Sequence, residues 1–112
     1  VSNVGTNDMP FDEPNYFGGE LWEEWDLYSN RSPIRHAAGI STPTLVVRGQ
    51  EDTRVPLGQA QEFYRALWKR GVPSQLVIYP RAGHFPDEPK QWQDLWLREI
   101  SWMDSYVKGN SL

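Results

Sequence analysis

The sequence has 112 residues, which allow one domain at most and a core of limited size. A net charge of −4 and the lack of a basic cluster argue against nucleic acid and anionic membrane as partners. The sequence has no cysteine, which excludes disulfides, thiolate catalysis and Cys-ligated zinc. It contains no run of about 18 apolar residues, so we expect no membrane-spanning segment. No signal peptide pattern is visible, which gives a cytoplasmic location a slight preference and otherwise leaves the compartment open.

Aromatic residues are frequent, with 6 Trp, 5 Tyr and 4 Phe. Core filling and contacts between helices and a sheet are the main explanation that we expect for this content. An aromatic carbohydrate-binding module is the alternative. A coplanar, exposed set of tryptophans would support that alternative, and a buried set would exclude it.

The first 40 residues predict short and irregular elements. Residues 1–4 have the composition of the last turn of a strand, and residues 5–20, rich in Gly, Asn, Asp and Pro, predict a long loop. A short helix is expected over residues 21–30 and a helical turn over residues 34–38. The sequence does not begin with Met, which is consistent with a processed or excised piece.

A strand–helix–strand unit follows, and it predicts an α/β fold with a parallel sheet. Residues 45–47 form a β-branched apolar run that predicts a strand buried on both faces, and residues 75–79 predict a second strand. The helix expected between them spans residues 57–70, and this order implies a right-handed crossover. A last helix is expected over residues 89–107. Two apolar stripes predict the buried faces of these helices: Leu57, Ala60, Phe63, Tyr64, Leu67 and Trp68, and then Trp92, Leu95, Trp96, Ile100, Met103 and Val107.

An acid and a histidine follow the two predicted strands. Asp52 comes after the first strand and His84 after the second, 32 positions further on. Neighbouring parallel strands end at the same edge of a sheet, where α/β proteins place active-site groups. We therefore expect an Asp52 oxygen within about 3.5 Å of a His84 ring nitrogen. In such a pair the carboxylate fixes the imidazole tautomer, and the other ring nitrogen becomes a general base.

Other interpretations of these residues remain. The acid can be a turn former or a helix cap, and a single histidine in a loop is more often structural than catalytic. Glu51 competes with Asp52 as the acid, and Asp52 is preferred for its shorter side chain and its place beside the turn. His36 has no partner acid in its neighbourhood and is assigned to the surface. The spacing of histidines and acids favours no metal site.

The expected nucleophile is missing from this sequence. In α/β-hydrolases the order along the chain is Ser, acid, His, with the serine on a Gly-x-Ser-x-Gly turn. The flanking glycines are absent from Ser2, Ser29, Ser32, Ser41 and Ser74. The chain therefore carries two-thirds of a triad, and we expect it to be inactive alone.

These segments together resemble the prolyl oligopeptidase family, and within it the acylaminoacyl-peptidases and dipeptidyl-peptidase-like enzymes. Residues 42–56, which include Gln50-Glu51-Asp52 and Arg54-Val55-Pro56, are similar to the acid loop of that family, and Tyr79 to His84 to its histidine loop. Further similar segments are Gln61 to Leu67, Gly71-Val72-Pro73, Phe17-Gly18-Gly19 with Trp22-Glu23, and Ser32-Pro33-Ile34.

The resemblance implies that residues 1–112 form the C-terminal portion of an α/β-hydrolase domain, with two full parallel strands, an N-terminal strand stub and flanking helices. It implies Asp52 as triad acid and His84 as triad base of a serine peptidase or esterase that acts on peptide or acyl-ester substrates, with no cofactor. Arg48 departs from the family pattern, which has His at this position. The nucleophile turn, the oxyanion donors and the propeller domain are also missing.

Two further expectations concern partners. The first predicted strand has an unpaired edge, and such edges pair readily with other chains. We expect association either with the N-terminal remainder of the same hydrolase or with further copies, as a dimer or larger assembly. A catalytically silent, hydrolase-derived interaction module is the alternative function.

Overall fold

The computed structural model describes residues 2–109. Its elements in chain order are the 3-10 helix η1 (Ser2–Gly5), α1 (Asp12–Phe17), α2 (Trp25–Asn30), the 3-10 helix η2 (Pro33–Gly39), β1 (Thr44–Gly49), α3 (Leu57–Lys69), β2 (Ser74–Tyr79), α4 (Pro89–Met103) and the π-helix η3 (Asp104–Lys108).

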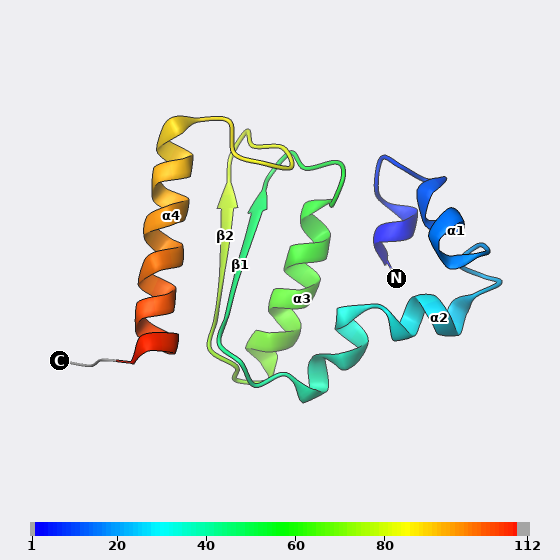
Figure 1. Ribbon diagram of the computed structural model, residues 1–112, viewed down its shortest axis with the longest axis horizontal. Helices are drawn as coiled ribbons and strands as arrows, with labels where there is room; N and C mark the ends of the chain where they lie inside the picture. Colours follow the sequence, from blue (N-terminus) through cyan, green and yellow to red (C-terminus); the bar gives the residue numbers. More distant parts are fainter. Residues whose placement is uncertain (1, 110–112) are drawn as a thin grey trace.

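The two strands form a parallel sheet between two helices. β1 pairs with β2 from Thr44 opposite Ser74 to Gly49 opposite Tyr79. The β-branched residues in each strand suit a pleated, partly covered surface. α3 lies on one side of the sheet and α4 on the other (Figure 1). The predicted parallel sheet with flanking helices is therefore confirmed.

α3 is held by the apolar stripe that its periodicity predicts. Leu67 is fully buried and Ala60 nearly so. The helix ends where Gly71 adopts a positive φ of 73°, a conformation that glycine takes without a steric penalty. Trp68 was expected in the same stripe but its exposed fraction is 63%. It lies in the last turn of the helix, where the described residues do not cover it.

The main core lies between the sheet and the first half of α4. Its buried residues are Val77, Tyr79, Ala82 and Leu95, with Leu45, Val47 and Trp92 packed against them. The Tyr79 hydroxyl also donates to Asp94 Oδ2 at 2.8 Å, and burial together with this carboxylate raises the pKa of Tyr79 to about 12. β1 is only half-buried, apart from Gly49, and not buried on both faces as predicted. A strand in a two-stranded sheet lacks the neighbours that would cover it fully.

α4 and η3 leave much of their apolar side chain surface exposed. Trp96, Ile100, Met103 and Val107 were predicted on an inner face, yet each is more than half exposed. The helix also changes to π geometry at Asp104 instead of continuing unchanged to residue 107. None of the helices within residues 2–109 has the length and apolar character needed to cross a membrane.

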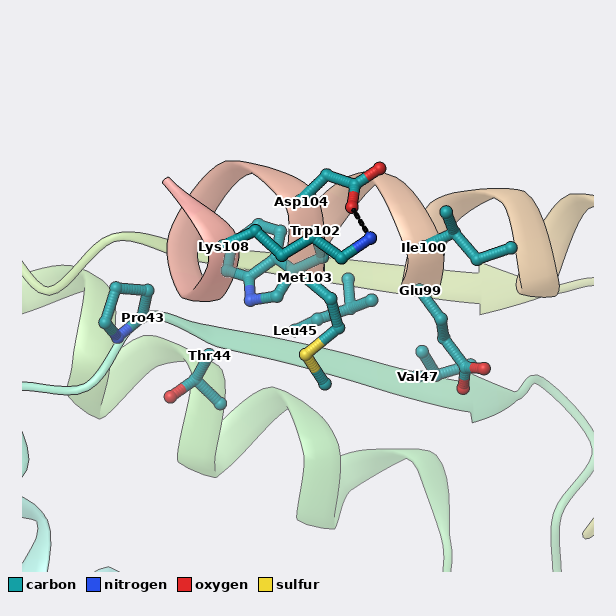
Figure 2. Close-up of a pocket in the computed structure, with 10 residues that line it drawn as sticks. All are labelled: Pro43, Thr44, Leu45, Val47, Glu99, Ile100, Trp102, Met103, Asp104 and Lys108. Carbon is teal, nitrogen blue, oxygen red and sulfur yellow. Dashed lines mark ion pairs between the residues drawn. The ribbon is translucent and has the colours of Figure 1, made fainter. Parts of the chain in front are cut away.

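An open groove of about 630 Å³ lies between this surface and β1. Figure 2 shows Leu45 and Val47 of β1 facing Met103 of α4 across it. The groove is lined by Pro43, Thr44, Leu45, Val47, Glu99, Ile100, Trp102, Met103, Asp104 and Lys108.

The N-terminal segment differs from its prediction. Residues 2–5 form a 3-10 helix and not a strand stub, and residue 1 lies outside the described residues. Ser2 Oγ donates to Glu62 Oε2 at 2.9 Å, so this segment contacts the outer side of α3 and does not approach the sheet (Figure 1). The loop predicted over residues 5–20 contains α1, which ends at Gly18 with φ 79°.

Candidate active site

The acid loop and the histidine loop lie against each other at the carboxyl end of the sheet. The N–H of Gln50 donates to the Tyr79 carbonyl and that of Glu51 donates to the Ala82 carbonyl, both at 2.9 Å. A Cβ atom placed on Gly49 would lie 2.0 Å from the carbonyl oxygen of Gly83. Only glycine therefore allows the two loops to approach this closely.

Asp52 is the buried acid of this site. Its side chain is 0% exposed, and Oδ1 accepts the Val55 N–H at 2.8 Å. Oδ2 accepts from Arg48 Nη1 and lies beside His84 Nδ1, each at 3.0 Å. Burial by itself raises the pKa of this carboxyl, but the hydrogen bonds from the Val55 N–H, from His84 and from Arg48 together hold that pKa below its ordinary value.

Side-chain contacts join the histidine loop to the start of α4. Arg81 opens it with φ 63°, an uncommon conformation for a residue other than glycine. The Arg81 guanidinium donates to both carboxylate oxygens of Glu88, at 2.8 and 3.0 Å. Gln91, buried on α4, donates from Nε2 to the Pro80 carbonyl at 2.8 Å. These contacts fix the path of the chain that carries His84.

The predicted contact between Asp52 and His84 is confirmed at 3.0 Å. An ionised carboxylate can only accept a hydrogen bond, so Nδ1 carries the proton that is donated to Asp52. In the neutral ring Nε2 then holds a lone pair and can accept a proton. The side chain of His84 is 43% exposed, so a reacting group can approach it.

A small cleft of about 200 Å³ adjoins this pair. Asp8 from the N-terminal segment lines it and pairs with Arg54 Nε at 2.6 Å. Thr53 Oγ1 also donates to Asp8, and the Thr53 and Arg54 hydrogen bonds lower the pKa of the Asp8 carboxyl. Asp8 was not predicted as a site residue, because no local sequence pattern links it to a loop 45 positions away. The pairing of Arg48 with Asp52 was also not predicted, although only four positions separate the two residues.

The other candidate residues are not part of the pair. Glu51 is exposed and contributes its backbone N–H to the loop contact described above. His36 is exposed on η2, as expected, with Nε2 2.8 Å from the Asn30 carbonyl oxygen. Within residues 2–109, no group of three or more His, Asp or Glu side chains is arranged to hold a metal ion.

The exposed tryptophans do not form one platform. The exposed tryptophans lie in three separate regions: Trp22 and Trp25 before and at the start of α2, Trp68 on α3 and Trp96 on α4. The rings of Trp92 and Trp96 are neighbours but are tilted by 44°. The coplanar arrangement that a carbohydrate-stacking surface requires is not present in this pair.

Comparison with known proteins identifies the family. The profile of the prolyl oligopeptidase family matches residues 1–110. The chain belongs to the prolyl oligopeptidase family. It is accordingly a member of a peptidase family with the α/β-hydrolase fold, as the resemblance of its two loops implied.

Related prolyl oligopeptidase family members come from animals, plants and bacteria. The chain is 36% identical to the acylamino-acid-releasing enzyme of Rattus norvegicus over 83 residues, or 74% of the chain. It is 32% identical to the Mus musculus enzyme of the same name over 115 residues, and 31% identical to dipeptidyl-peptidase 5 of Porphyromonas gingivalis over 95 residues. The matches cover 96% and 81% of the chain in these last two cases. The chain spans only 11%, 16% and 14% of the length of these three relatives, respectively.

Proposed function

We propose that this chain supplies the acid and the base of a Ser-Asp-His triad in a serine peptidase or esterase. The observation that carries the proposal is the 3.0 Å contact between Asp52 Oδ2 and His84 Nδ1 at the ends of adjacent parallel strands. Two further points support it. The chain belongs to the prolyl oligopeptidase family, and its acid precedes its histidine, which is the order that α/β-hydrolases use.

The chemistry proposed is acyl transfer. A serine hydroxyl loses its proton to His84 Nε2 as its oxygen attacks the substrate carbonyl, and Asp52 stabilises the resulting imidazolium. His84 then donates that proton to the leaving amine or alcohol, and the acyl-enzyme is hydrolysed in a second round. Backbone N–H groups at an oxyanion site would stabilise the tetrahedral intermediate.

The serine is proposed to come from polypeptide other than these 112 residues. No Gly-x-Ser-x-Gly pattern occurs in the sequence. The isolated chain is accordingly expected to be inactive, and its role is to complete a site on a larger hydrolase. The names of the relatives support, as the proposed substrate class, peptides from which an acylated amino acid or a dipeptide is released.

Covalent labelling with a fluorophosphonate tests the proposal, since this reagent reacts with activated serines. The comparison is between the isolated 112-residue chain and the full product of the reading frame that encodes it. We expect the full product to be labelled, His84→Ala to abolish labelling, and His36→Ala, which removes the exposed histidine of η2, to leave it unchanged. Labelling of the isolated chain, or undiminished labelling of the His84→Ala full product, would overturn the proposal.

A further inference from the structure

Arg48 contacts the carboxylate of Asp52 from the strand below the acid loop. Its Nη1 atom donates to Asp52 Oδ2 at 3.0 Å, the same distance and the same oxygen as for His84 Nδ1. The Arg48 side chain is 23% exposed and that of Asp52 is 0% exposed, so this ion pair is largely shielded from water. A shielded pair is screened less than a surface pair, and each partner depends more strongly on the other.

The three donors to Asp52 come from different parts of the structure. Arg48 belongs to β1, which pairs with β2 along its full length. The Val55 N–H lies in the same loop as Asp52, directly before α3. His84 lies in the irregular segment between β2 and α4. Two of the three donors therefore hold the carboxylate without any contribution from the histidine loop.

The other charged groups at this cleft are engaged elsewhere or point to solvent. Arg54 is paired with Asp8, and Glu51 is exposed. Among the described residues, the charged side chains in contact with the Asp52 carboxylate are Arg48 and, when protonated, His84. Arg48 Nε is buried without a hydrogen-bond partner in the described part of the chain, which makes this placement costly unless the contact with Asp52 compensates for it.

We propose that Arg48 is a positioning residue that keeps the Asp52 carboxylate ionised and oriented toward His84, whether or not the histidine loop is in place. The orientation of the carboxylate is then set by Arg48 and the Val55 N–H and does not depend on the contact with His84. A role of Arg48 in catalysis rests on the proposed triad. Its effect on the charge and orientation of Asp52 does not, because that effect depends only on the groups that contact the carboxylate.

The test is an NMR titration of the Asp52 side-chain carboxyl carbon in the 112-residue chain. Arg48→Gln removes the guanidinium whose Nη1 donates to Asp52 and helps to lower the pKa of this carboxyl, so it is expected to shift the Asp52 titration to higher pH. Arg48→Lys, which keeps the charge, is expected to shift it less. Arg54→Gln is the matched control: it is expected to shift the titration of Asp8 and leave that of Asp52 unchanged.

A second variant tests the same point without altering Arg48. In His84→Gln, Asp52 is still expected to titrate below the ordinary Asp range, because Arg48 and Val55 remain. An Asp52 titration that is unmoved by Arg48→Gln, or that returns to the ordinary range in His84→Gln, would overturn the proposal. The titration needs no serine nucleophile, so its outcome is independent of the labelling result that tests the triad itself.

Discussion

The two loops of the site approach each other very closely at Gly49. The nearest atoms to an added Cβ are the backbone oxygens of Gly83 and Ala82, at 2.0 and 2.4 Å, and backbone atoms cannot rotate away as a side chain would. A single methyl group at this point would push the histidine loop away from the acid loop. The 3.0 Å contact between Asp52 and His84 therefore depends on the absence of a side chain at position 49.

Gly49→Ala is expected to lower the free energy of unfolding by about 3 kcal/mol, the upper part of the range for overpacking a tight site. Gly58→Ala is the control, because Gly58 lies in the first turn of α3 and a Cβ there meets nothing within 4 Å, so little or no loss of stability is expected. Urea unfolding of both variants measures the difference. Equal stabilities of the two would contradict the close approach described here.

Asp52 also predicts a pH dependence of stability. The pKa of Asp52 is lowered in the folded chain, so the unfolded chain binds more protons at acidic pH. The ionised carboxylate therefore stabilises the fold above the ordinary Asp pKa, and this stabilisation is lost as the pH falls. We expect the free energy of unfolding to fall as pH drops below about 4. Asp52→Asn should flatten part of that slope, while the lowered pKa values of Asp8 and Asp94 retain the rest. Urea unfolding at a series of pH values measures this, and parallel slopes for the two proteins would contradict it.

At the residue scale, the sequence predicted the partners that the sheet topology brings together. Asp52 and His84 follow adjacent parallel strands, so the order of elements sufficed to pair them. Asp8 could not be predicted in the same way, because it reaches Arg54 from an irregular segment 46 positions earlier. The short 3-10 and α-helical elements that carry it there have no strong periodicity.

At the level of elements, α3 shows which part of an apolar stripe contributes to stability. Leu67 and Trp68 are neighbours in the sequence, yet one is 0% and the other 63% exposed. Leu67→Ala is expected to cost about 3 kcal/mol because Leu67 is fully buried and its truncation leaves a cavity. Trp68→Ala is expected to change the free energy of unfolding by less than about 1 kcal/mol. Thermal or urea unfolding of this matched pair provides the measurement, and a larger loss for Trp68→Ala would show that α3 packs differently.

The successes and errors in predicting elements have a common physical cause. Periodicity indicates which side chains share a face, so α3, both strands and most of α4 were predicted within a few residues. It does not indicate whether another element covers that face, and the predicted inner side of α4 is for this reason largely exposed. The strand stub over residues 1–4 was wrong for residues 2–4, which contact α3 and have no neighbouring strand to pair with.

The whole molecule is more extended than its length predicts. Its radius of gyration is 16.2 Å, against about 13 Å for a compact domain of this length. The groove beside β1 and the exposed apolar residues of α4 are on the same side of the sheet. We propose that this surface and the free edge of β1 bind a strand-bearing segment of the same hydrolase, since a strand added beside β1 would pair its backbone groups and cover the groove.

Hydrogen exchange measures this association. The β1 amides are expected to exchange more slowly in the full product of the reading frame than in the isolated chain, and Met103→Glu, which places a charge in the groove, is expected to reduce that protection. Glu62→Gln serves as the control, because Glu62 is not among the residues that line the groove.

Sedimentation equilibrium tests the isolated chain. At micromolar concentration we expect it to self-associate through the same surface. A compact monomer with a melt independent of protein concentration would contradict the need for a partner.

The activity of Asp52→Asn in the full product of the reading frame tests the central claim most directly. Hydrolysis of N-acetylalanine p-nitroanilide is measured for the unaltered protein, for Asp52→Asn and for Asp8→Asn, which changes a cleft carboxylate that does not contact His84. If Asp52 orients His84 as the triad base, Asp52→Asn is expected to lower kcat by about four orders of magnitude, because the imidazole loses its oriented tautomer, and Asp8→Asn to lower it far less. A folded Asp52→Asn protein that retains kcat within about tenfold of the unaltered protein would contradict the account, since that is less than one positioned acid–base group contributes.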